Sequence, residues 1–203
     1  AELLRDRELD VDLYLLGSTR EEVSGAGATV GTWAVQPDFC VAVDVTHGKT
    51  PDGPADKAFA IGGGPAIGVG PNMTRWMTNR MLAKAKERQI PYQLEVMSGH
   101  TGTNGWEMQI SREGVATSVL SLPLKYMHSP IEVLSLADME QVAALLVAFT
   151  EGLGKAAARR CETCWSACVR LTPCPAGRTR CAPSSWRRWS HTQTGCGWTL
   201  WAT

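Results

Sequence analysis

Apolar runs and alternating segments mark the strands expected along this chain of 203 residues. Residues 39–45 (FCVAVDV) form an almost unbroken apolar, β-branched run, which is typical of a strand buried on both faces. The other apolar segments are shorter or alternate with polar positions. Together the pattern predicts strands at residues 11–17, 39–45, 65–69, 92–97 and 116–122.

Helical spacing is clearest in residues 72–88. There Met73, Trp76, Met77 and Met81 recur on one side, and charged residues lie on the other side or at the end. A stripe of this kind predicts a helix packed into the core. Further helices are expected at residues 24–35, at residues 104–113 and from Ser135 onward.

The last of these helices carries a start signal and a stop signal. Ser135 with Asp138 three residues later resembles a capping box, with Asp in the usual Glu or Gln place. An apolar stripe follows, and Gly152 and Gly154 end it. At the other end of the chain, residues 1–5 read as the last turns of a helix.

Strands that alternate with helices indicate an α/β fold, a three-layer sandwich with a largely parallel central sheet, over residues 1–153. The chain has 20 basic and 20 acidic residues. That balance gives no electrostatic reason to expect nucleic acid or an anionic membrane as a partner. No apolar run of about 18 residues is present, so no membrane-spanning helix is expected.

The composition changes sharply near Lys155. Six of the seven cysteines and five of the eight tryptophans follow it, and the arginines there are almost unopposed by acids. The spacing from Cys161 to Cys168 (C-x-x-C-x-x-x-C) suggests zinc, but no second C-x-x-C pair follows and the one histidine there stands alone. We therefore expect residues 154–203 to be an irregular tail, with the composition that a GC-rich gene yields in a shifted reading frame.

Acidic and imidazole side chains stand where three predicted strands end. Glu21 and Glu22 follow the first strand, Asp44 and His47 end the second, and His128 follows the last. Sites in α/β sheets assemble at the C-terminal strand edge. Each residue also has an ordinary interpretation, because paired glutamates are often solvated, a strand-end aspartate is often a turn residue, and a lone histidine is often structural.

Metal-assisted hydrolysis would explain the adjacent glutamates. One can bind a metal while its neighbour takes a proton from water, and such sites use oxygen and imidazole ligands. A glycosidase pair fits less well, because its carboxyl groups flank a sugar at about 5–9.5 Å from each other. From composition and spacing alone, surface acids and a metal site both stay open.

Three strings carry a family resemblance: GSTREEVSGAGA (17–28), VAVDVTHGKTPDG (41–53) and the segment 90–133 that contains KYMHSP. In this order they resemble metallopeptidase family 42, the glutamyl and deblocking aminopeptidases that assemble as tetrahedral particles. The resemblance runs to about residue 153. It implies a metal-dependent aminopeptidase acting on short peptides, two divalent metal ions (zinc or cobalt) and a homo-oligomer. A cytoplasmic location is expected, which suits the single cysteine before the tail, Cys40.

The resemblance also assigns roles. It implies that Glu21 is the catalytic base, that Glu22 and His128 bind one metal, and that Asp44 binds the other. His47 is not a ligand by this resemblance, and local hydrogen bonding near Asp44 is expected for it.

Two further segments are rich in glycine. The loop GHTGTNGW (99–106) resembles one that lines the substrate pocket, so Gly102, Thr103 and Asn104 are expected there, although many family members have an acid where Asn104 stands. The run Gly62–Gly64 lacks the ending of a phosphate-binding loop and is expected to be a flexible connection.

The family's remaining ligands, a histidine in an HxD motif and a bridging aspartate, have no counterpart in the sequence. We therefore expect a truncated catalytic domain that begins inside a larger protein. The alternatives are an inactive fragment and, suggested only by the family name "cellulase M", an endo-β-glucanase.

Overall fold

The structure is a computed structural model that describes residues 2–51, 53, 57–153 and 198–202. Within this part of the chain, a seven-stranded sheet has the order β1-β7-β2-β5-β3-β4, with β6 beside β5. The strands are β1 (Leu13–Gly17), β2 (Phe39–His47), β3 (Ala66–Val69), β4 (Gln93–Val96), β5 (Ala116–Lys125), β6 (Val133–Leu134) and β7 (Trp198–Ala202).

The two longest strands, β2 and β5, pair in parallel from Phe39↔Ala116 to His47↔Leu124. The sheet is mixed, because β3 runs antiparallel to β5 and β7 runs antiparallel to both of its neighbours. Strands β1, β2 and β5 nevertheless share one direction. Their C-terminal ends therefore meet at the same edge of the sheet.

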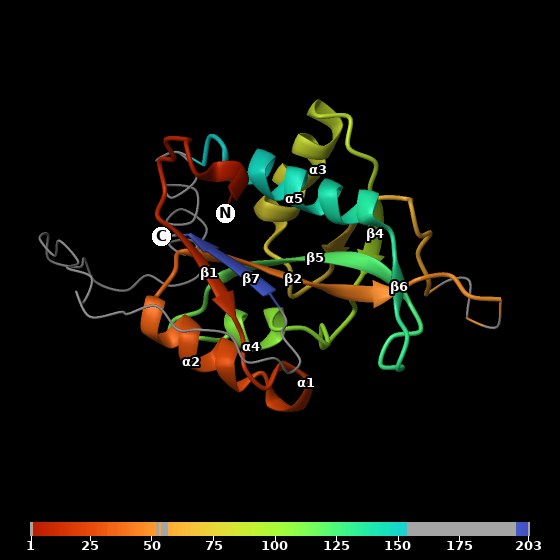
Figure 1. The fold of residues 1–203 in the computed structure, drawn as a ribbon. Helices are drawn as coiled ribbons and strands as arrows, with labels where there is room; N and C mark the ends of the chain where they lie inside the picture. Colours follow the sequence, from red (N-terminus) through yellow and green to blue (C-terminus); the bar gives the residue numbers. More distant parts are fainter. Residues whose placement is uncertain (1, 52, 54–56, 154–197, 203) are drawn as a thin grey trace, which may run out of the picture.

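Helices cover both faces of the sheet, which confirms the expected three-layer α/β sandwich. In Figure 1, α3 and α5 lie on one face, and α1, α2 and α4 lie on the other. The helices are α1 (Glu21–Ser24), α2 (Ala26–Val35), α3 (Arg75–Glu87), α4 (Gly105–Gln109) and α5 (Leu136–Thr150), with a short 3-10 helix at Glu2–Leu4. In the described residues, no helix is long and apolar enough to span a membrane.

The main core lies between the sheet and the α3/α5 layer. Met77 and Met81 of α3 are fully buried, as is Phe149 of α5. The Phe149 ring contacts Phe39 of β2 and Trp76 of α3, at centroid distances of 6.3 and 6.5 Å. The Met/Trp stripe is thus core, as predicted. Each large apolar side chain buried in this way stabilises the fold by about 1.5–3 kcal/mol.

The start of α5 also fixes the glycine-rich run. Ser135 caps the helix by accepting the N–H of Asp138 at 3.3 Å, as predicted. The buried Asp138 carboxylate accepts the N–H groups of Gly62 and Gly64 at 2.7 and 3.0 Å, and Gln93 bonds the same loop. The φ angles of these two glycines, 81° and 85°, favour glycine. The run is therefore held in place, and the prediction of a flexible connection is wrong.

Strand β7 differs from the irregular tail that the sequence predicts. Trp198–Ala202 lie between β1 and β2 and pair with both (Figure 1). Aromatic and β-branched residues favour strands, and unpaired backbone groups of β1 and β2 favour a partner. For these five residues the prediction of irregular structure is wrong. Residues 154–197, with the cysteine cluster, lie outside the described residues.

Candidate active site

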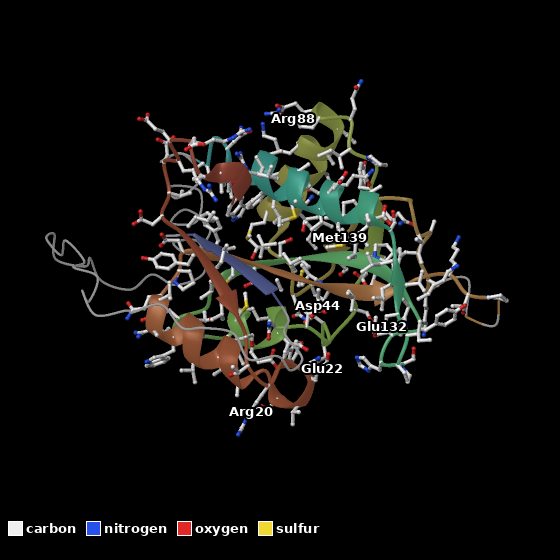
Figure 2. All side chains as sticks on the ribbon, viewed as in Figure 1. Arg20, Glu22, Asp44, Arg88, Glu132 and Met139 are labelled. Atoms are coloured by element: carbon white, nitrogen blue, oxygen red, sulfur yellow. The ribbon has the colours of Figure 1, made fainter. Side chains whose placement is uncertain are left out.

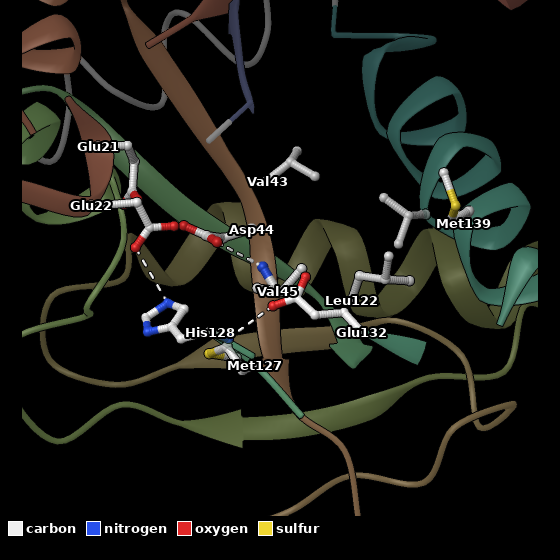
Figure 3. Close-up of a pocket in the computed structure, with 11 residues that line it drawn as sticks. Glu21, Glu22, Val43, Asp44, Val45, Leu122, Met127, His128, Glu132 and Met139 are labelled. Atoms are coloured by element: carbon white, nitrogen blue, oxygen red, sulfur yellow. Dashed lines mark hydrogen bonds and ion pairs between the residues drawn. The ribbon is translucent and has the colours of Figure 1, made fainter. Parts of the chain in front are cut away.

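The C-terminal ends of β1, β2 and β5 bring four predicted residues to one hollow of ≈ 330 Å³. Glu21 and Glu22 begin α1 directly after β1, Asp44 lies near the end of β2, and His128 follows β5. Figure 3 shows their side chains on one side of β2. The apolar walls are formed by Val43, Val45, Leu122, Met127, Met139 and Val142.

His128 and Glu22 are in contact. His128 Nε2 lies 3.3 Å from Glu22 Oε2, although both side chains are more than half exposed (Figure 3). His128 takes a left-handed backbone conformation with φ of 61°. Its backbone N–H donates to Glu132 Oε1 at 2.8 Å. The imidazole therefore reaches the glutamate pair from a turn with an unusual backbone.

Asp44 sits in an environment that disfavours its charge. Burial raises the pKa of Asp44 to about 6, the N–H of Val45 opposes this by donating to Oδ1 at 2.7 Å, and the charges of Glu22 and Glu95 raise the pKa further. His128 acts in the opposite direction. A buried carboxylate among acids is stabilised by any cation that enters.

Glu21 is shifted in the same direction. Burial raises the pKa of Glu21 to about 7, with further contributions from Asp44, Glu22 and Glu107, while His128 lowers it. A carboxyl group with a pKa close to neutrality can both accept and donate a proton at the pH of the cell. Glu21 in the metal-free chain can therefore exchange a proton near neutral pH, and its role as catalytic base stays a prediction.

The donor types around the hollow suit a divalent metal. Carboxylate oxygen and imidazole nitrogen are common zinc ligands, and mutual repulsion of carboxylates is what a cation relieves. Glu22 and His128 are the pair closest to a ligand set. Across the described residues, however, no group of three or more His, Cys, Asp or Glu side chains is arranged to hold a metal ion. The residue types around the hollow are therefore suitable metal ligands, but too few of them are grouped to hold an ion by themselves.

Three acidic residues near the site were not predicted from the sequence. Glu132 lines the hollow. Glu95 accepts from Thr46 Oγ1 at 2.6 Å, and the Glu107 carboxyl group packs so close to Gly25 that a Cβ there would lie 2.6 Å from it. Figure 2 places Glu22, Asp44 and Glu132 around the same end of the sheet. Of these three residues, only Glu132 lies close in the sequence to a predicted site residue, four positions after His128.

The predicted substrate residues lie elsewhere. Gly102, Thr103 and Asn104 are not among the residues that line this hollow. Thr103 and Asn104 are 6% and 1% exposed, and Asn104 Oδ1 accepts from Ser18 Oγ at 3.3 Å. Asn104 therefore joins its loop to the segment after β1, Thr103 Oγ1 accepts the N–H of Gly105 within the loop at 3.1 Å, and contact of either residue with substrate stays a prediction.

His47 does not line the hollow, as the resemblance implies for a residue that is not a ligand. Its side chain is exposed at the end of β2, and its backbone carbonyl accepts the N–H of Phe59 at 2.8 Å. This backbone bond joins the end of β2 to residue 59, and local hydrogen bonding of the His47 side chain near Asp44 stays a prediction.

Comparison with known proteins identifies the family of this chain. The model of the M42 glutamyl aminopeptidase family matches residues 1–145. The chain belongs to this family. A lysyl aminopeptidase of Pyrococcus furiosus is 38% identical over 146 residues, which cover 72% of this chain and 42% of that protein. The resemblance drawn from the three sequence strings is confirmed.

Solved structures of the family share the fold. A TET aminopeptidase from a marine sediment archaeon of the Thaumarchaeota superposes with a TM-score of 0.66 and 27% identity, covering 71% of this chain and 41% of that one. The TET1 peptidase of Pyrococcus horikoshii can assemble into a tetrahedron or a large octahedral shell. It superposes with a TM-score of 0.51 and 26% identity, covering 65% of this chain and 38% of that one. This member of the M42 family thus spans about two fifths of the length of these relatives.

Proposed function

We propose that this chain forms part of the active site of a metal-dependent aminopeptidase that removes N-terminal residues from short peptides. The observation that carries the proposal is that Glu21, Glu22, Asp44 and His128, from three different elements, line one hollow. Membership of the M42 family supports the reaction type. The assembly of the Pyrococcus horikoshii relative supports a homo-oligomer, and we place the protein in the cytoplasm.

In this proposal, Glu22 and His128 hold one divalent ion and Asp44 holds a second, with zinc or cobalt as the metal. The metals supply positive charge that polarises a peptide carbonyl and makes water more acidic.

Glu21 is the proton carrier. Its carboxylate accepts a proton from the attacking water and delivers it to the amine that leaves. In the metal-free chain, burial raises the pKa of Glu21 to about 7, and a bound divalent ion would lower it and favour the carboxylate that accepts the proton.

The test is Glu21→Gln in a chimaera that joins this chain to the unmatched part of the Pyrococcus furiosus lysyl aminopeptidase. The variant should keep its metal and lose about 10²–10⁴-fold in hydrolysis of aminoacyl-nitroanilides. Glu140→Gln, on the exposed side of α5, is the matched control and should keep full activity. A loss below about tenfold for Glu21→Gln argues against the base role. Cellulose hydrolysis that survives metal removal would instead support the endo-β-glucanase.

A second proposal concerns residues 1–203 alone: they bind metal weakly and turn over no peptide. Catalytic zinc usually has three protein ligands, and the described residues offer no group of three. Isothermal titration with zinc and cobalt, beside a leucyl-nitroanilide assay, tests this inactive state. Two tight sites with turnover would mean that other residues, such as His47 or His100, complete the ligand set.

A further inference from the structure

The turn that carries His128 has an unusual backbone. It joins β5 to β6, and the last register pair before it is Lys125↔Val133. Tyr126 and His128 both take left-handed conformations, with φ of 63° and 61°. Residues other than glycine keep such conformations only where their surroundings hold them. The contacts of this turn therefore decide where the His128 imidazole lies.

Three hydrogen bonds hold the turn. The N–H of Ser129 donates to the carbonyl of Tyr126 at 3.0 Å, and Ser129 Oγ donates to the carbonyl of Ile131 at 2.7 Å. The third bond joins the backbone N–H of His128 to Glu132 Oε1 at 2.8 Å. Only this third bond is made by His128 itself, and its acceptor is a carboxylate, which strengthens it.

Glu132 also belongs to the hollow. It is one of the lining residues, and Figure 3 shows it between His128 and the apolar wall formed by Leu122 and Met139. One carboxylate thus bonds the backbone of His128, while the imidazole of the same residue contacts Glu22 at 3.3 Å.

We propose that Glu132 is a positioning residue: by accepting the backbone N–H of His128, it keeps this residue left-handed and its imidazole beside Glu22. The consequence for metal binding rests on the function proposed above, whereas the backbone role does not. If Glu132 were itself a ligand, the charge of its carboxylate would be essential. As a positioning residue, it needs only an acceptor oxygen.

Two variants of the full chain distinguish a positioning role of Glu132 from a role as metal ligand. Glu132→Gln keeps an acceptor oxygen at the same place, and Glu132→Ala removes it. Glu140→Ala, at an exposed position on α5, is the control. The amide spectrum away from the turn should be unchanged in all three variants.

The first measurement uses metal-free protein. The coupling between the amide proton and Hα of His128 reports its φ, and the nuclear Overhauser effect from its imidazole reports the contact with Glu22. Both should change in Glu132→Ala and stay as in the parent in Glu132→Gln and Glu140→Ala. Parent-like values in Glu132→Ala would overturn the proposal.

The second measurement is a Zn²⁺ titration followed by the His128 imidazole resonances. Glu132→Ala should weaken binding about tenfold, at the lower end for residues that support a ligand, because this bond is exposed to solvent. Glu132→Gln should stay within about threefold of the parent, since an acceptor remains. Equal losses in both variants would overturn the proposal in favour of direct ligation. The His128 resonances of the parent could also show no response to Zn²⁺ while the metal-free measurement agrees with the prediction. That result would contradict the proposed metal site and support the positioning role.

Discussion

The two faces of β2 differ in what they bury. On the face toward α3 and α5, Val41 joins the large core with Met77 and Phe149. On the opposite face, Cys40 packs only in a small cluster with Ala28 and Met108, and Asp44 follows two positions beyond Ala42. Because side chains alternate along a strand, one element contributes to both environments.

This difference shows how one strand can support an energetically unfavourable site on one face while its other face is part of the core. The large core stabilises the sheet through apolar burial. The acidic edge adds little stability, since burial and the charge of Glu22 raise the pKa of both Glu21 and Asp44. A site of this kind is tolerated because the opposite face holds the strand that carries it.

The largest expected effect is on the free energy of unfolding, which should differ between a substitution in the core and one at the acidic edge. Phe149→Ala should lower the free energy of unfolding by about 3–5 kcal/mol, because it leaves a cavity beside Phe39 and Trp76. Glu21→Gln should lower the free energy of unfolding by less than about 1 kcal/mol, or raise it, because the neutral amide removes repulsion between neighbouring carboxylates. Urea unfolding at pH 7 measures both. Comparable losses in the two variants would contradict the division between the faces.

A smaller effect is expected from β7, which joins β1 to β2. Truncation before Trp198 should lower the free energy of unfolding by about 1 kcal/mol or more, or about 2–4 °C in Tm, because it removes two ladders of backbone hydrogen bonds. The irregular tail expected from the sequence predicts the opposite, namely that removing residues from about 156 onward leaves the Tm unchanged or raises it. Differential scanning calorimetry of truncations at residues 155 and 197 decides between them.

The last effect is a pH dependence of the metal-free protein, which solvent screening reduces because both carboxyl groups are partly exposed. The pKa of Asp44 is raised from 3.8 to about 6 and that of Glu21 from 4.5 to about 7, so the folded state holds protons that the unfolded chain has released. Their contribution to stability is present below about pH 4 and is lost as the pH rises to about 7. Asp44→Asn should flatten this fall in Tm and raise the Tm at pH 7. A parent Tm that rises over this range, with the slope unchanged in Asp44→Asn, would show that these groups do not set it.

Local patterns were sufficient for several elements. The period of Met73, Trp76, Met77 and Met81 predicted the buried side of α3, and Ser135 predicted the start of α5. Both depend on neighbours within a few residues, where the backbone geometry of a helix is known in advance. The order of the family strings identified residues that the fold brings to one hollow.

What the sequence determined by itself was therefore the apolar periods, the helix cap and the identity of Glu21, Glu22, Asp44 and His128. Only the tertiary structure decided how Asp138 holds Gly62 and Gly64, where β7 lies, and that Asn104 is buried. It also decided the left-handed turn at His128 and its bond to Glu132. The physical reason is that a buried polar group takes whichever partner the packed chain brings to it, and most of these partners lie far away along the chain.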